Sequence, residues 1–369
     1  MSPCLRTFHS DSPLELESGR RLESFDLAFE SYGALNEERD NAILVCHGLT
    51  SDSHVALDHD CPDDRPGWWE EAVGPGKPFD TNKYFVVCSN VLGGCGGSSG
   101  PSSLDNTSGS NFGLLFPIVT VKDIVNAQAR LADSLCIDSF HTVVGGCLGG
   151  FQTLEWMSGH PLRMRNAIVI SATIRTTTHN LGLWEVVRQA IMRDPNFHGG
   201  DYYGKKAPTD GMGLAQMFGM MIWMDRKVMS DRFGLKTIHE NGPTYSLEPE
   251  FEFQAFLHRI GKNAANRFDP NSLIYLTKAM DYFDLTRNCE TTKEVFAGGN
   301  FRSLLIGYSE DWRYPPGEMS EISHALSANS KPHEFQVLDS DFGHGAFIYD
   351  SEGALDVIRR FMASVEKNG

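Results

Sequence analysis

Short apolar runs alternate with amphipathic stretches along the first half of the chain. Runs of about four to eight apolar residues are typical of strands that are buried on both faces of a parallel sheet. Such strands are expected at 41–46, 84–88, 141–144 and 167–171, and helical spacing covers 121–135 and resumes at 151–158. The alternation predicts an α/β fold, with a mostly parallel central sheet and helices on both of its faces.

The alternation stops between about residue 178 and residue 300. Aromatic- and methionine-rich helical stretches, such as 212–224, take its place. Strand-like apolar runs return near 301–307 and 334–338. The sequence therefore predicts an α/β core made of two parts, 1–177 and 301–369, and a helical lid at 178–300 that is inserted between them.

The composition is that of a globular chain with a strong acidic excess. Of its 369 residues, 41% are hydrophobic and 22% are charged, and the formal net charge is −16. This charge argues against a nucleic-acid surface, which needs clustered Lys and Arg. The first residues lack the pattern of a secretory signal and no apolar run is as long as a membrane span, so we expect a cytoplasmic protein without a membrane partner.

The cysteines and histidines give no sign of a metal site. The eight cysteines are scattered without C-x-x-C spacing, and the 13 histidines include no H-E-x-x-H motif. In a reducing compartment most of these cysteines are expected to be free thiols.

The segment 143–150 (VVGGCLGG) places a cysteine in a glycine-rich turn between a predicted strand and a predicted helix. Flanking glycines let the backbone make a sharp bend, which lifts the central side chain above the sheet. The turn predicts Cys147 as a nucleophile and the amide of Leu148 as a donor to an oxyanion. The alternative is that Cys147 is a small buried hydrophobic residue beside a tight turn.

Two residues that follow later predicted strands are candidate catalytic partners of Cys147. Asp311 comes after the first of them, and His344 stands in a loop before the last helix. Nucleophile, acid, histidine is the chain order of the α/β-hydrolase triad, in which His344 would take the thiol proton and Asp311 would orient the imidazole. Glu310 is the alternative acid. Leu49, after the first predicted strand, would supply the second oxyanion amide.

Longer segments of the chain resemble those of the homoserine O-acetyltransferases, which are enzymes of the α/β-hydrolase type. The resemblance covers nearly the whole length, and its segments are 47–54 (HGLTSDSH), 74–81 (GPGKPFDT), 89–95 (SNVLGGC), 116–117 (FP), 188–191 (RQAI), 199–203 (GGDYY) and 281–284 (DYFD). It implies that acetyl-CoA acylates the nucleophile and that a hydroxyl of an amino acid then takes the acyl group, in a tunnel under the lid. It also implies a homodimer formed through the lid helices and no permanently bound cofactor.

The chain departs from this family where the family binds its substrate. Family members have serine at the position of Cys147, and an acidic residue that holds the substrate ammonium at the position of Gly345. By spacing, Gln216 stands at the position of the family's carboxylate-binding arginine, and Trp223 stands at the position of a family tyrosine. Losing two charge-assisted hydrogen bonds, worth roughly 1.5–3 kcal/mol each, predicts an acceptor other than homoserine. Arg175 is then a candidate for binding an anionic substrate group.

These observations predict an acyltransferase that forms a thioester at Cys147. The acyl group would come from CoA, another thioester or an acyl carrier protein, and would pass to a small acceptor. A thioester suits such transfer because it is nearly isoenergetic with its donor and reacts readily with amines and thiols. The alternatives are a thioesterase or esterase of the same fold, a homoserine or serine O-acetyltransferase proper, a binding protein without activity, and a serine enzyme whose nucleophile was replaced to trap a complex.

Overall fold

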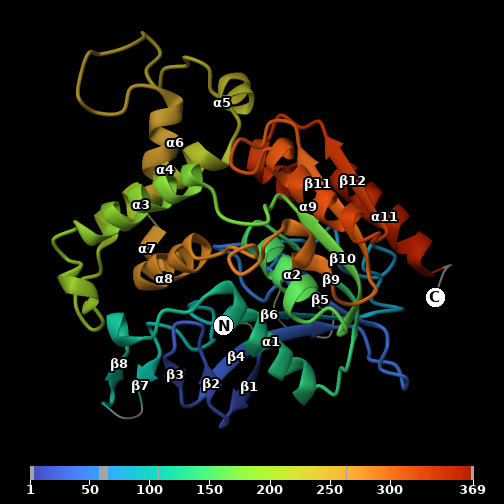
Figure 1. The fold of residues 1–369 in the computed structure, drawn as a ribbon. Helices are drawn as coiled ribbons and strands as arrows, with labels where there is room; N and C mark the ends of the chain where they lie inside the picture. Colours follow the sequence, from blue (N-terminus) through green and yellow to red (C-terminus); the bar gives the residue numbers. More distant parts are fainter. Residues whose placement is uncertain (1–3, 58–64, 106–107, 263, 367–369) are drawn as a thin grey trace.

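The computed structural model describes residues 4–57, 65–105, 108–262 and 264–366. Its central sheet has eight strands in the order β1-β4-β6-β5-β9-β10-β11-β12 (Figure 1). Their bounds are β1 Arg6–Ser10, β4 Phe25–Tyr32, β5 Ala42–Cys46, β6 Phe85–Ser89, β9 Phe140–Gly146, β10 Met164–Ile170, β11 Arg302–Tyr308 and β12 His333–Leu338. Of these eight strands, β4 alone runs opposite to the others. The predicted mostly parallel sheet is confirmed, and the six strands expected from apolar runs are β5, β6 and β9 to β12.

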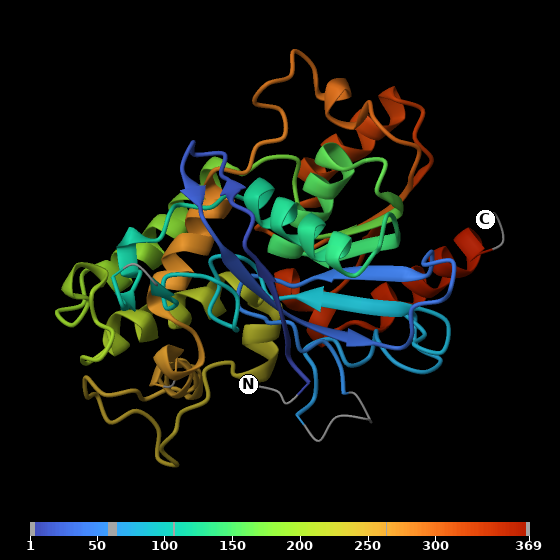
Figure 2. The same ribbon diagram turned by 90° about the horizontal axis from the view of Figure 1, so that it is seen from below.

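Helices cover the sheet on both faces (Figures 1 and 2). One face packs against α1 Val121–Ser134, α2 Leu148–Gly159 and α9 Pro316–Ala328, and the other packs against α11 Glu352–Glu366. Along β10 the side chain of Val169 enters the first core, whereas Ile168 and Ile170 enter the second. This burial on two sides explains why the parallel strands are apolar without alternation.

Between β10 and β11, the named elements of the described residues are all helical. The longer ones are α3 Thr178–Met192, α4 Thr209–Trp223, α5 Arg226–Arg232, α6 Glu252–Lys262, α7 Ala264–Arg267 and α8 Pro270–Asp281. Figure 1 shows α3, α4 and α6 gathered beside the sheet, not on either of its covered faces. We call α3 to α8 the helical insertion. A buried ion pair of 2.8 Å between Arg188 and Asp281 joins α3 to α8, so Arg188 is a structural residue of this layer.

The remaining elements are short. They are the hairpins of β2 Leu14–Glu15 with β3 Arg21–Leu22 and of β7 Leu104–Asp105 with β8 Ser110–Asn111, together with α10 Ala346–Tyr349 and four 3-10 turns. Within the described ranges, no helix has both the length and the apolar character needed to cross a membrane. Six of the cysteines are free thiols, which agrees with the expectation for most of them.

Candidate active site

Cys147 occupies the turn between β9 and α2. Its backbone has φ 58°, a value that residues with a side chain rarely adopt. The neighbouring glycines are required by space: a Cβ on Gly149 would lie 1.9 Å from the carbonyl oxygen of Cys46, and one on Gly145 would lie 2.4 Å from the backbone of Gly149. The predicted sharp turn therefore forms, and it holds the cysteine at the carboxyl end of the sheet, where α/β proteins place their sites.

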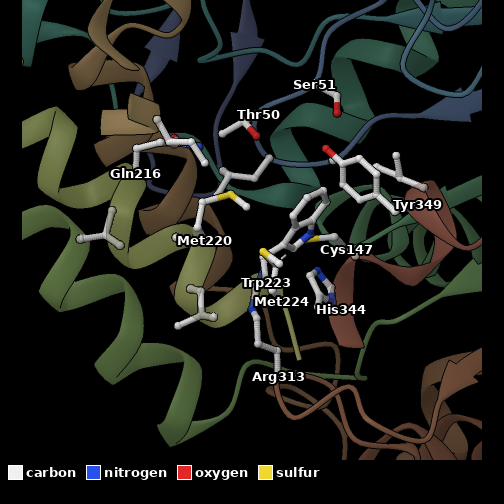
Figure 3. A pocket seen from close by; sticks show the side chains of 18 of the residues that line it. Thr50, Ser51, Cys147, Gln216, Met220, Trp223, Met224, Arg313, His344 and Tyr349 are labelled. Atoms are coloured by element: carbon white, nitrogen blue, oxygen red, sulfur yellow. Dashed lines mark hydrogen bonds between the residues drawn. The ribbon is translucent and has the colours of Figure 1, made fainter. Parts of the chain in front are cut away.

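His344 stands beside this cysteine (Figure 3), and Asp311 lies next to His344. The His344 Nδ1 donates to the Asp311 Oδ2 at 2.8 Å, and both side chains are buried. The other carboxylate oxygen, Oδ1, accepts the amides of Arg313 and Tyr314, each at 3.1 Å. Among the described residues, the His344 Nε2 forms no hydrogen bond, so it remains available to the sulfur or to a substrate. The structure brings Asp311 to the histidine and leaves Glu310 exposed.

The charges around the sulfur favour a thiolate. Burial opposes ionisation of Cys147, but the cations of His344 and Arg313 and the amide of Leu148 outweigh it and lower the pKa of the thiol to about 6. Burial likewise opposes protonation of His344, and the carboxylate of Asp311 raises the pKa of the imidazole above its ordinary value. Both shifts favour the thiolate–imidazolium form, which is the reactive form of such a pair.

Arg313 is a buried cation that sequence reasoning did not identify. Its Nη1 lies 4.0 Å from the Cys147 Sγ, and the residue is 3% exposed. Its Nε donates to Asn180 Oδ1 at 3.4 Å and its Nη2 donates to Tyr314 Oη at 3.1 Å, while the guanidinium lies 4.6 Å from the ring centre of Trp184. No carboxylate of the described chain forms an ion pair with it within 4.0 Å. The sulfur is thus the anion closest to this guanidinium, and the only available signal was its place two residues after the acid.

The two predicted oxyanion donors face the same region. Leu148 opens α2, and its amide interacts with the sulfur. Leu49 lines the cavity above Cys147. Next to it, burial lowers the pKa of His47, so this imidazole is neutral: its Nδ1 donates to the Gly48 carbonyl at 2.7 Å and its Nε2 accepts the amide of Val91 at 3.1 Å. His47 thereby fixes the backbone that carries the Leu49 amide.

A cavity of about 530 Å³ lies above Cys147, between the triad loops and the helical insertion (Figure 3). It is lined mainly by apolar side chains, and its polar groups include Thr50, Ser51 and Tyr349, which the sequence did not single out. Three of the predicted substrate residues, Gln216, Trp223 and Gly345, also line it. The volume is within the usual range for a site that binds a small molecule.

Trp223 packs against Gly345 in the lining of this cavity. A Cβ on Gly345 would lie 3.2 to 3.4 Å from atoms of the indole, so a side chain there fits only if the ring moves. The indole also packs edge-on against Tyr349, with 4.8 Å between ring centres. The position that holds an acid in the resembled family is therefore filled by an aromatic ring from α4.

Arg175 does not line this cavity. Its Nη2 lies 3.0 Å from the carboxylate of Glu321, and its backbone forms a β-bridge with Asp284. These contacts hold it outside the site, so its predicted role in binding an anion finds no support in the geometry. Arg313, on the loop after β11, is the buried arginine that faces the sulfur.

The comparisons with known proteins agree with this geometry. Residues 41–351 match the family model described as alpha/beta hydrolase fold. The homoserine O-acetyltransferase of Methanohalobium evestigatum is 44% identical over 95% of this chain and 71% of its own length. The homoserine O-succinyltransferase of Alkalilimnicola ehrlichii is 41% identical over 98% of this chain and 95% of its own. The crystal structure of homoserine O-acetyltransferase from Bacillus anthracis superposes with a TM-score of 0.90 at 26% identity, covering 97% of both chains.

Proposed function

We propose a reaction for this chain on the premise of its family: it belongs to the homoserine O-acyltransferases, which have the α/β-hydrolase fold, and it is an acyltransferase. The proposed reaction passes an acyl group from a thioester donor such as acyl-CoA to a small acceptor through a thioester on Cys147. The single observation that supports it is the buried Cys147–His344–Asp311 arrangement beside a cavity that the helical insertion helps to line. This arrangement supplies a nucleophile, a proton carrier and limited access for water.

The first half-reaction acylates the enzyme. The Cys147 thiolate attacks the donor carbonyl carbon, and the amides of Leu49 and Leu148 bind the resulting oxyanion. When the tetrahedral adduct collapses, the carbon–sulfur bond of the donor breaks and the leaving thiolate takes the proton of the His344 imidazolium. Asp311 keeps the imidazole in the tautomer that this step requires.

The second half-reaction releases the acyl group. The acceptor hydroxyl or amine gives its proton to the His344 Nε2 as its oxygen or nitrogen attacks the acyl carbon. Collapse of this adduct expels the Cys147 Sγ as a thiolate, which restores the resting ion pair.

Arg313 suggests which acyl group is transferred. Acylation removes the negative charge from the sulfur, which is the anion closest to the Arg313 guanidinium, and so weakens the charge compensation of this buried cation. An acyl chain that ends in a carboxylate would replace that anion, and a succinyl group has two methylenes with which to reach it. Two relatives are named homoserine O-succinyltransferase, which favours the same donor. We therefore propose succinyl thioesters as donors ahead of acetyl thioesters.

The acceptor site differs from that of the resembled family. Gly345 and Gln216 provide neither the anion nor the cation that would hold an α-amino acid, and Trp223 covers the place of the missing acid. We propose an acceptor with a nucleophilic hydroxyl or amine and without an α-ammonium and α-carboxylate pair. The names of the relatives favour homoserine, which is the second candidate, and a hydrolase that uses water is the third.

Intact-mass measurement tests the reaction and the acceptor together. Incubation with a succinyl thioester should add one succinyl group to the protein and none to C147A. The adduct should then persist in buffer and disappear on addition of a suitable acceptor, with homoserine, serine and uncharged alcohols and amines as parallel arms. Absence of the adduct contradicts the covalent mechanism, and rapid release of free acid without an acceptor identifies a thioesterase.

We also propose that the protein is a dimer formed through the helical insertion. Helices α3 and α4 expose apolar side chains to a degree unusual for a solvent-facing layer: Leu181, Val186, Met192, Leu214 and Met221 are 39% to 57% exposed. Light scattering coupled to gel filtration should give twice the chain mass of 41.0 kDa, and a mass of one chain contradicts the dimer.

A further inference from the structure

Three exposed arginines of the helical insertion lie at or beside the cavity above Cys147. They are Arg232 at the end of α5, Arg259 in α6 and Arg267 at the end of α7, and we call them the mouth arginines. Arg232 and Arg267 line the same cavity as Cys147, and both arginines are exposed whereas Cys147 is buried. Among the described residues, none of the three has a carboxylate within 4.0 Å, whereas Lys227 on the same α5 is paired with both Asp231 and Asp341.

Aromatic rings hold two of these guanidinium groups in place. The Arg232 guanidinium lies 5.3 Å from the ring centre of Phe233 and 5.7 Å from that of Phe256, and the Arg259 guanidinium lies 5.5 Å from Phe256. Phe256 itself lines the cavity. Stacking on a ring uses the flat face of a guanidinium and leaves its N–H edge free for an anion. Arg232 and Arg259 are therefore positioned before any ligand binds.

The mouth arginines contrast with the acidic charge of the whole molecule. With a formal net charge of −16, the protein repels anions, and an anionic ligand needs a local cationic surface to approach the cavity. A ligand that fits both ends has an anionic group at the mouth and a reactive carbonyl at the sulfur. A phosphopantetheine thioester has this design, with phosphate at one end and the acyl thioester at the other, and arginine is well suited to bind phosphate.

We propose that the mouth arginines bind the phosphate groups of a pantetheine-type acyl donor and direct its thioester toward Cys147. The inference rests on the proposed acyl transfer from a thioester, and it assigns a binding site to the end of the donor that does not react. CoA and a carrier protein bearing phosphopantetheine share this chemistry.

The test compares donors that differ in their phosphates. The rate of succinyl addition to Cys147 is measured with succinyl-CoA, with a succinylated carrier protein and with succinyl-N-acetylcysteamine, which has no phosphate. In R232Q, R259Q and R267Q, the ratio of the succinyl-CoA rate to the N-acetylcysteamine rate should fall about tenfold, and added salt should lower the same ratio in the unaltered protein. The same ratio is formed with the rate for the succinylated carrier protein. If the variants lower this second ratio and leave the succinyl-CoA ratio unchanged, the carrier protein is the source of the phosphate.

R226Q is the matched control, because Arg226 is also an exposed arginine of α5 but faces a different groove. It should leave the ratio within twofold. An unchanged ratio in all three arginine variants for both phosphate-bearing donors overturns the inference while acylation by succinyl-N-acetylcysteamine still stands. Failure of every donor to modify Cys147 instead overturns the proposed acyl transfer itself.

Discussion

Replacing Arg313 by leucine should raise the pKa of the Cys147 thiol. The guanidinium Nη1 lies 4.0 Å from the sulfur. Two unit charges at that distance interact by about 4 kcal/mol at an effective dielectric constant of about 20, and one pH unit corresponds to about 1.36 kcal/mol. Removing the cation therefore moves the pKa from about 6 toward 8 to 9, near the ordinary value of about 8.5 for cysteine. The thiolate fraction at pH 7 should fall from most of the protein to a few per cent.

Alkylation by iodoacetamide measures this change, because only the thiolate reacts. In the unaltered protein the rate at the Cys147 peptide should rise with pH through a midpoint near 6, and in R313L the midpoint should lie two or more pH units higher. R313K is the matched control, since it keeps a cation among Asn180, Trp184 and Tyr314 and should keep a midpoint below about 7.5. A midpoint that stays near 6 in R313L would refute the reasoning that the guanidinium stabilises the thiolate.

The structure leads to three further predictions. C147S should keep the fold but lose at least about a hundredfold in the rate of acylation, because a serine hydroxyl is not ionised beside His344; equal rates in the succinyl-thioester assay would argue against a thiolate mechanism. G149A should destabilise the protein by about 3 kcal/mol or more in urea unfolding, because its Cβ would lie 1.9 Å from a backbone carbonyl, whereas G219A, which meets no atom within 4 Å, should be neutral or slightly stabilising. G345D should lower the free energy of unfolding by about 1–3 kcal/mol through its clash with Trp223. Adding W223Y should recover that stability and increase acyl transfer to homoserine, and no increase in the double variant would show that these two positions do not select the acceptor.

The elements that sequence reasoning found are those whose pattern is local. Uninterrupted apolar runs predicted β5 and β9 because strands covered on both faces need no polar side. Strands β1 and β4 were missed since β1 is an edge strand with exposed positions and β4 contains polar residues among its buried ones. The candidate triad was found because its order and its glycine turn are visible in the chain.

The features that sequence reasoning missed depend on contacts between distant parts of the chain. Arg313 is buried because Asn180 and Trp184, more than 120 positions earlier, surround its guanidinium. Its neighbours in sequence, which include the exposed Trp312, give no sign of that burial. The contact of Trp223 with Gly345 likewise joins the helical insertion to the loop that carries His344, and spacing along the chain gives no sign of it.

Two departures from the resembled family, Cys147 and Gly345, both affect the negative charge on the sulfur. An acidic residue at position 345 would stand directly after His344, close enough to the sulfur to repel a thiolate and raise its pKa. With serine as nucleophile this repulsion costs little, because the hydroxyl is neutral at rest; with cysteine it opposes the reactive state. Gly345 removes that anion, and Arg313 places a cation 4.0 Å from the sulfur. A cysteine nucleophile and an acceptor site without an ammonium anchor are therefore electrostatically compatible, so the proposed nucleophile and the proposed acceptor support each other.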